Sequence, residues 1–193
     1  MRSTKPGSAV RRIARSRSAL VLVDFQKRLM PAIHDASAVV DEACRLADIA
    51  RVLAIPIIGT EQNPAGLGPN IEPIRERCAA TLAKMHFDGC RDGLVDALRQ
   101  HANGDIEDVV LAGCEAHVCL LQTALGVIDA GLRVFVVEAA CGSRRPADHR
   151  LAMRRLERAG ATLASTEMLA FEWLESSSDP SFRSVLALVK GGT

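Results

Sequence analysis

The chain has 193 residues, of which 48% are hydrophobic and 24% are charged, and its formal net charge is +1. These values are typical of one globular domain with a single large core, and they exclude a chain-wide attraction to nucleic acid or anionic lipid. No apolar run approaches the roughly 18 residues of a membrane-spanning helix. Because the first apolar run also lacks a signal-peptide cleavage site, we expect a cytoplasmic protein with no nucleic-acid or membrane partner.

The N-terminal segment is basic: six lysine or arginine residues precede Asp24, which is the first acidic residue. We therefore expect a loose arm over residues 1–17 and one domain over residues 18–193. The arm has three possible meanings, namely a solvated extension, a targeting peptide or a contact for an anion. The six cysteines include no CxxC pair, so we expect reduced thiols.

From residue 18 onward, short β-rich runs alternate with longer helical patterns. The β-rich runs are 19–24, 55–61, 81–86, 108–113, 133–138 and 162–165, and the helical patterns are 35–53, a short helix from Glu72, 93–102, 117–131, 146–160 and 166–175, with a loop over 62–70. Those runs that are apolar throughout instead of alternating, such as ALVLV, are typical of strands buried on both faces, as in a parallel sheet covered by helices. The sequence thus predicts an α/β fold, a three-layer α/β/α sandwich with a mostly parallel sheet.

In an open parallel sheet, functional sites form beyond the carboxyl ends of the strands. The polar residues expected there are Asp24, Glu61, Gln62, Lys84 and the segment 113–119. An acid, an ammonium group and a thiol would therefore meet at one edge of the sheet.

Cys119 lies in the first turn of its predicted helix, where free backbone N–H groups and the helix dipole favour negative charge. With an ammonium group nearby, we expect a depressed pKa and a nucleophilic thiolate. Cys114 ends a strand without such a field, so we expect it in the core. Taken singly, each residue has a simpler interpretation: Asp24 as a cap, Lys84 as a surface lysine and Cys119 as a small buried hydrophobe.

A metal or nucleotide site is not indicated by the motifs. His117 with the two neighbouring cysteines offers at most three donors from one tight bend, and the other histidines form no HxH or HxxxH pattern. No GxGxxG follows the first strand and no GK[ST] occurs. We therefore expect neither a metal nor a cofactor.

Four segments resemble the isochorismatase-like cysteine hydrolases over roughly residues 18–175: ALVLVDFQ, GTEQNPAGLGP, AKMHFDGC and VVLAGCEAHVCLLQTALGVIDAGLRVFVVEAACGSR. The segments EQNPAGLGP and EAHVCLLQTA are most similar in sequence to the branch known only as isochorismatase-domain hydrolases, whose substrates are largely undefined. The resemblance implies a catalytic triad of Asp24, Lys84 and Cys119. It also implies a non-proline cis peptide between Cys114 and Glu115, and an oxyanion hole built from the backbone N–H groups of Glu115 and Cys119.

The implied reaction is hydrolysis of a small amide-like C–N bond through a thioester on Cys119. Nicotinamidases hold a metal with an aspartate and histidines in the loop after the second strand, but EQNPAGLGPN has no histidine there. True isochorismatases lack a cysteine at the nucleophile position, so Cys119 disfavours their vinyl-ether cleavage. Glu61, Gln62 and His117 are our candidates for substrate binding.

Two other functions stay open: a thiol redox or peroxide sensor of the same fold, and a non-catalytic oligomeric module. Relatives are usually oligomers, so we expect a homo-oligomer with a small-molecule substrate. The apolar C-terminal stretches FEWLE and SVLALV are either a subunit interface or a final helix packed on its own core.

Overall fold

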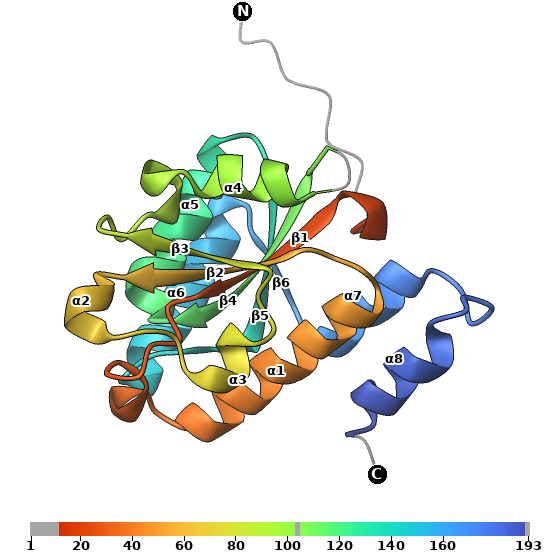
Figure 1. Cartoon of the computed structure of the whole chain (residues 1–193), viewed down its shortest axis with the longest axis horizontal. Helices are drawn as coiled ribbons and strands as arrows, with labels where there is room; N and C mark the ends of the chain where they lie inside the picture. Colours follow the sequence, from red (N-terminus) through yellow and green to blue (C-terminus); the bar gives the residue numbers. More distant parts are fainter. Residues whose placement is uncertain (1–11, 103–104, 192–193) are drawn as a thin grey trace, which may run out of the picture.

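The computed structural model describes residues 12–102 and 105–191, and the first eleven residues of the predicted arm lie outside the described residues. The described residues contain a six-stranded sheet in which every pairing is parallel, as predicted (Figure 1). The strands are β1 (Ser18–Val23), β2 (Ile57–Gln62), β3 (Ala80–Lys84), β4 (Asp108–Cys114), β5 (Arg133–Gly142) and β6 (Thr162–Ala164).

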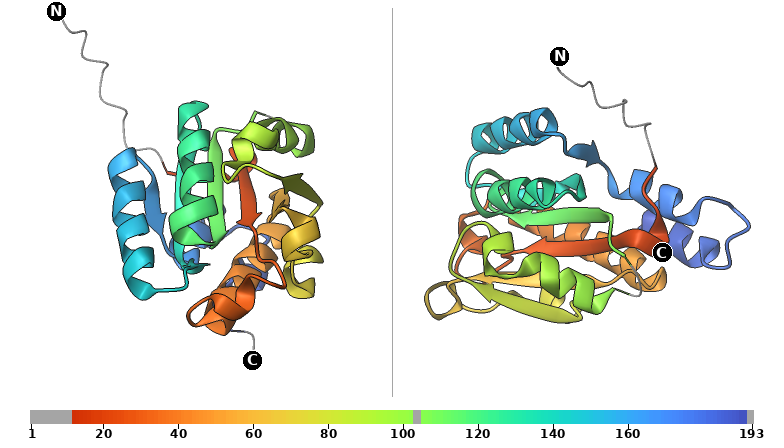
Figure 2. Two further views of the ribbon diagram at one scale, coloured as in Figure 1. Left: turned by 90° about the vertical axis from the view of Figure 1, so that its left-hand side faces the viewer. Right: turned by 90° about the horizontal axis from the view of Figure 1, so that it is seen from above.

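Helices cover both faces of this sheet (Figure 2). They are α1 (Ala36–Val52), α2 (Pro64–Leu67), α3 (Glu72–Arg75), α4 (Leu94–His101), α5 (Leu121–Asp129), α6 (Pro146–Ala159), α7 (Thr166–Leu174) and α8 (Phe182–Val189), with short turns η1 (Arg15–Arg17), η2 (Met30–Ala32), η3 (Gly89–Asp92) and η4 (Ala116–Leu120).

The side chains of β1 show how the three layers form. Leu20 and Leu22 belong to the core shared with α1, α7 and α8, whereas Val21 and Val23 belong to the core shared with α4, α5 and α6. Successive residues of a strand point to opposite faces, so an apolar strand supplies both cores at once. The predicted three-layer α/β/α sandwich is confirmed.

The strand order is β3-β2-β1-β4-β5-β6, so the chain builds outward from β1 in one direction and then from β4 in the other. Crossovers leave the sheet in opposite directions at such a switch point, which opens a crevice beyond the carboxyl ends of the two central strands. Asp24 follows β1 and Glu115 follows β4. The topology therefore predicts a functional site at these two strand ends.

The main departures from the predicted elements are three. The helix predicted over 117–131 begins as the π-helical turn η4 and becomes α-helical only at Leu121, and the strand predicted over 133–138 continues to Gly142. The predicted loop 62–70 contains the one-turn helix α2. Apolar spacing cannot reveal a π turn, because it depends on which backbone groups pair at the strand-to-helix bend.

Residues 12–17, the described part of the predicted arm, are attached to the domain and not loose. Ile13 is only 2% exposed and belongs to the core beside α1. The Ala14 N–H donates to Asp108 Oδ2 at 3.0 Å, and Arg15 Nε donates to the Leu53 carbonyl at 2.7 Å. A buried apolar residue and two hydrogen bonds thus fix this segment next to the start of β1.

The C-terminal apolar stretches form α7 and α8, which pack on the domain's own core through Trp173, Leu174 and Val185. Trp173 Nε1 also donates to Ser18 Oγ at 3.0 Å, so α7 is tied to the first strand. In the part of the chain that the structure describes, no helix combines the length and apolarity needed to span a bilayer.

We expect Gly113→Ala to destabilise the fold. Gly113 has φ +145°, and a Cβ there would lie 2.2 Å from the Val23 carbonyl oxygen on the neighbouring strand. Overpacking of this kind costs about 1–3 kcal/mol. The matched control is Gly131→Ala, where φ is +84° but nothing lies within 4 Å of the added carbon. Urea unfolding should show the larger loss for Gly113→Ala, and equal losses would contradict the steric explanation.

Candidate active site

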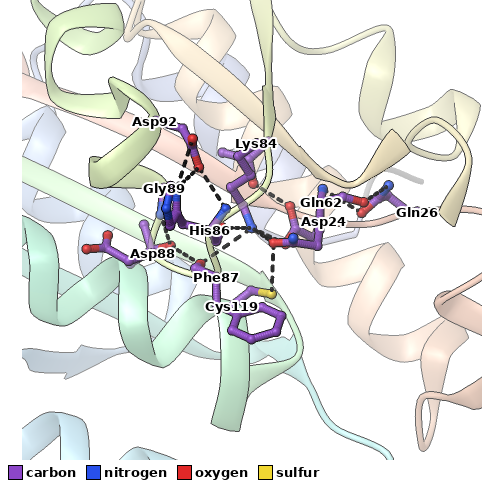
Figure 3. A network of polar contacts seen from close by, with 12 residues as sticks. Asp24, Gln26, Gln62, Lys84, His86, Phe87, Asp88, Gly89, Asp92 and Cys119 are labelled. Carbon is purple, nitrogen blue, oxygen red and sulfur yellow. Dashed lines mark hydrogen bonds and ion pairs between the residues drawn. The ribbon is translucent and has the colours of Figure 1, made fainter. Parts of the chain in front are cut away.

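An ion pair at the carboxyl edge of the sheet forms the centre of the candidate site (Figure 3). Lys84 Nζ lies 2.8 Å from Asp24 Oδ2, and both side chains are fully buried. Asp24 follows β1 and Lys84 ends β3, with β2 between them in the sheet. The structure therefore brings together an acid and an ammonium group that are 60 positions apart in the sequence.

The backbone at Asp24 explains how its carboxylate reaches Lys84. Val23 faces the α4–α6 core, so an unbroken strand would turn residue 24 toward the opposite face. Asp24 instead has φ +52°, a left-handed conformation that aspartate tolerates better than most residues. Thr60 Oγ1 on β2 donates to Asp24 Oδ1 at 2.6 Å and holds the carboxylate in this direction.

The Lys84 ammonium group is surrounded by oxygen atoms. Besides the ion pair with Asp24, it donates to Gln62 Oε1 at 2.7 Å and lies 3.4 Å from the carbonyl oxygens of His86 and Phe87. Burying a charge is costly unless it is paired and hydrogen-bonded. These partners keep a cation inside the protein next to the third predicted residue, Cys119.

Cys119 lies in η4, and its thiol joins the same network. Its sulfur lies 3.9 Å from Gln62 Oε1, the atom that also accepts from Lys84. Cys119 is 6% exposed, more than the two other buried cysteines, Cys114 at 0% and Cys141 at 3%. The three residues of the predicted triad are thus gathered in one place, and Cys114 is in the core as expected.

The predicted depressed pKa of Cys119 is wrong. Burial raises the pKa of the Cys119 thiol to about 12, the Asp24 carboxylate raises it further, and the Lys84 ammonium only partly opposes them. The ammonium and the helix start favour the thiolate, but the loss of solvation on burial outweighs them. The resting thiol is therefore protonated at neutral pH and needs a base before it can act as a nucleophile.

The bend between β4 and η4 carries the residues predicted to bind an oxyanion. The peptide bond between Cys114 and Glu115 is cis, as the resemblance implies. The Glu115 carbonyl accepts from the N–H groups of Val118 at 3.0 Å and Leu120 at 3.3 Å, and its carboxylate accepts from Arg144 Nε at 2.7 Å. These bonds fix the bend from which η4, the turn that carries Cys119, begins.

The three candidates for substrate binding are placed differently. Gln62 is inside the network, and its Nε2 donates to the Met85 carbonyl at 2.8 Å, which fixes the direction of the amide. His117 is half-buried with Nδ1 3.0 Å from Ser143 Oγ. Glu61 is not brought to the site: its carboxylate accepts from the Asn70 N–H at 2.8 Å. Strand alternation could have separated Glu61 from Gln62 in the sequence, because neighbouring residues of β2 face opposite ways.

Two residues of the network were missed in the sequence. Thr60 orients Asp24, and its position two residues before Gln62 on the same strand places it on the same face. Gln26 is fully buried, and it brackets the backbone of Gln62 by accepting from the Gln62 N–H at 2.8 Å and donating to the Gln62 carbonyl at 3.0 Å. The segment ALVLVDFQ contains Gln26, but nothing in its spacing indicates this partner.

Other parts of the described chain offer less to this chemistry. Across residues 12–102 and 105–191, no group of three or more histidine, cysteine, aspartate or glutamate side chains could hold a metal ion. A cavity of about 650 Å³ lies between the starts of α1, α6 and α7, and its lining includes Glu138, Ser143 and His149 but none of Asp24, Lys84 and Cys119. The candidate site is therefore the ion-pair network and not this cavity.

We expect Lys84→Met to lower the free energy of unfolding by about 3–5 kcal/mol, because it leaves the Asp24 carboxylate buried without its partner. The double variant Asp24→Asn/Lys84→Met removes both charges and should recover much of that loss. Urea unfolding followed by circular dichroism checks both. A double variant no more stable than the single one would contradict the ion-pair explanation.

The raised pKa of Cys119 also predicts its alkylation profile. With a pKa of about 12, the thiolate fraction below that pH is smaller than in an ordinary cysteine. The rate of iodoacetamide labelling at Cys119 should therefore rise about tenfold per pH unit from pH 7 to 10 without a plateau. The urea-unfolded chain is the control, and its labelling rate should level off above the ordinary thiol pKa of about 8.5. Peptide mass spectrometry measures both rates, and a plateau below pH 8 in the folded protein would restore the depressed pKa.

Comparison with known proteins is consistent with this geometry. The Isochorismatase domain model matches residues 18–168. The mouse (Mus musculus) protein named isochorismatase domain-containing protein 2A is 34% identical over 181 residues, which cover 93% of this chain and 85% of the relative. The human (Homo sapiens) isochorismatase domain-containing protein 2 is also 34% identical over 181 residues, covering 93% of this chain and 86% of the relative.

Among solved structures, the MAR1 ribonuclease of Caenorhabditis elegans is similar with a TM-score of 0.87 and 34% identity, covering 93% of each chain. The match of the domain model to residues 18–168 spans more than half of the chain. It includes Asp24, Lys84 and Cys119. On these grounds, the chain belongs to the isochorismatase domain family, the isochorismatase-like hydrolases.

Proposed function

We propose that this protein is a cysteine hydrolase that cleaves the C–N bond of a small amide-like substrate through a thioester intermediate. Asp24, Lys84 and Cys119 are the catalytic residues. The observation that carries the proposal is the buried ion pair of Asp24 and Lys84, which shares Gln62 with the Cys119 thiol. A fold has no stability reason to bury two charges beside a thiol, because such pairs are often neutral or costly compared with apolar residues.

The first step is attack by sulfur. The Cys119 thiol is protonated at neutral pH, so the Asp24 carboxylate accepts its proton as the sulfur bonds to the carbonyl carbon of the substrate. The Lys84 ammonium stabilises the negative charge that develops on the sulfur. The carbonyl oxygen becomes an oxyanion, and the backbone N–H groups of Glu115 and Cys119 donate to it.

The second step releases the amine. The C–N bond breaks as the protonated Asp24 returns its proton to the leaving nitrogen, and the acyl group stays on the sulfur as a thioester. Asp24 is then a carboxylate again and removes a proton from water, which attacks the thioester. The acid leaves, and the thiol of Cys119 regains a proton from Asp24. The cycle needs one base that acts twice and one fixed cation.

The alternatives are less consistent with the site. A peroxide sensor relies on an accessible thiolate, but the pKa of Cys119 is raised to about 12 by burial. A non-catalytic oligomeric module has no use for a buried ion pair beside a thiol. The Caenorhabditis elegans neighbour is named a ribonuclease, yet a formal net charge of +1 gives this chain little attraction for a polyanion.

The proposal is tested by intact-protein mass spectrometry after incubation with a panel of small amides such as acetamide, propionamide and benzamide. We expect an acyl adduct on Cys119, and Cys119→Ala should lose both the adduct and all turnover. Asp24→Asn should slow acylation by about 10²–10⁴-fold, because a general base is lost. The control is Cys44→Ala, a half-buried cysteine on α1, which should behave as the wild type. Adducts on another cysteine would contradict the assignment.

A further inference from the structure

The chain has few aromatic rings, and one of them is exposed next to the candidate site. Aromatic residues make up 3% of the sequence, and Phe87 is 50% exposed. The other five are Phe25, Phe135 and Trp173, which are buried, and Phe171 and Phe182, whose ring centroids lie 6.4 Å apart. Phe87 is thus the most exposed ring and belongs to neither core.

The backbone of Phe87 is tied to the network that contains Cys119. Its carbonyl oxygen lies 3.4 Å from Lys84 Nζ and accepts from Thr123 Oγ1 at 3.3 Å. Thr123 lies four residues after Cys119 on the continuous run of η4 and α5. In Figure 3, the ring of Phe87 points toward the Cys119 sulfur. The Phe87 backbone thus contacts the network directly, and its ring extends from there toward Cys119 in this view.

The loop that carries Phe87 is held firmly. Asp92 Oδ2 accepts from the N–H groups of Met85 at 3.2 Å and His86 at 2.9 Å, and the Gly89 N–H donates to Thr123 Oγ1 at 3.1 Å. Even so, Met85 is 67% exposed. Single exposed apolar side chains are common on protein surfaces. Phe87, however, is carried by a loop that these hydrogen bonds fix to the network around Lys84.

We propose that Phe87 forms the apolar wall of the substrate-binding site, and that the substrates are small amides with an aryl or other apolar substituent. This inference rests on the proposed function. The amide carbonyl would lie at the Cys119 sulfur while the substituent lies against the Phe87 ring, where water is displaced from both. The wall selects substrates and takes no part in the transfer of protons.

The test compares benzamide with acetamide as substrates of wild-type protein and of Phe87→Ala. We expect Phe87→Ala to lower kcat/KM for benzamide at least about 10-fold through KM, because hydrophobic pockets discriminate single carbon groups by about 10–200-fold. Hydrolysis of acetamide should change less than about twofold, and Phe87→Leu should recover part of the benzamide activity. The control is Leu151→Ala on α6, whose side chain is 59% exposed and which should leave both substrates unaffected. Equal loss for both amides in Phe87→Ala would overturn the proposal.

A binding measurement separates this inference from the proposed function. Cys119→Ala protein should bind benzamide in a calorimetric titration more tightly than acetamide, and Cys119→Ala/Phe87→Ala should lose this preference. If binding depends on Phe87 while wild-type protein hydrolyses no amide, the substrate wall is supported and the proposed hydrolase function is contradicted. If wild-type protein hydrolyses both amides equally well, the hydrolase function is supported and the substrate wall is contradicted.

A second copy of the chain could also cover Met85 and Phe87, and the same variants detect it. Light scattering after gel filtration gives the molecular mass of wild-type, Phe87→Ala and Leu151→Ala protein. We expect all three to have the same mass and the same melting temperature. A smaller mass for Phe87→Ala would show that the two side chains belong to an interface between copies, and would overturn the assignment of a substrate wall.

Discussion

The buried ion pair of Asp24 and Lys84 is the contact on which the site depends. Its two charges leave water completely and approach to 2.8 Å. Such a pair persists only if the surroundings supply further hydrogen bonds, and here Thr60 and Gln62 do so from β2, the strand between the two. The register of three strands therefore fixes the geometry of the network: Val23 pairs with Thr60, and Gln62 pairs with Lys84.

The same burial sets the protonation state of Cys119, the proposed nucleophile. A thiol in this environment is held in the neutral form, since desolvation and the Asp24 carboxylate together outweigh the Lys84 ammonium. In the proposed reaction, the Cys119 proton therefore moves to Asp24 as the sulfur attacks, and no thiolate is present in the resting protein. This property also separates Cys119 from a redox sensor, which depends on a ready thiolate.

The positions of most candidate site residues follow from the sheet more than from the helices. Asp24 and Lys84 belong to strand ends, and the bend at Glu115 follows a third strand. The loop after β3 brings the Phe87 backbone back to Lys84 and Thr123. Each of these segments leaves the sheet at its carboxyl edge, where the strand order changes direction and side chains from distant segments can meet.

The sequence by itself determined the fold class and the membership of the site, because both follow from patterns that are local in the chain. Uniformly apolar strands require cover on both faces, and the polar residues after such strands must gather at one edge. Asp24, Lys84, Gln62 and Cys119 could be identified in this way. Tertiary structure alone decided how Asp24 turns through a left-handed residue and how deeply Cys119 is buried. These properties depend on solvation and on contacts between segments far apart in the chain, and no local pattern records them.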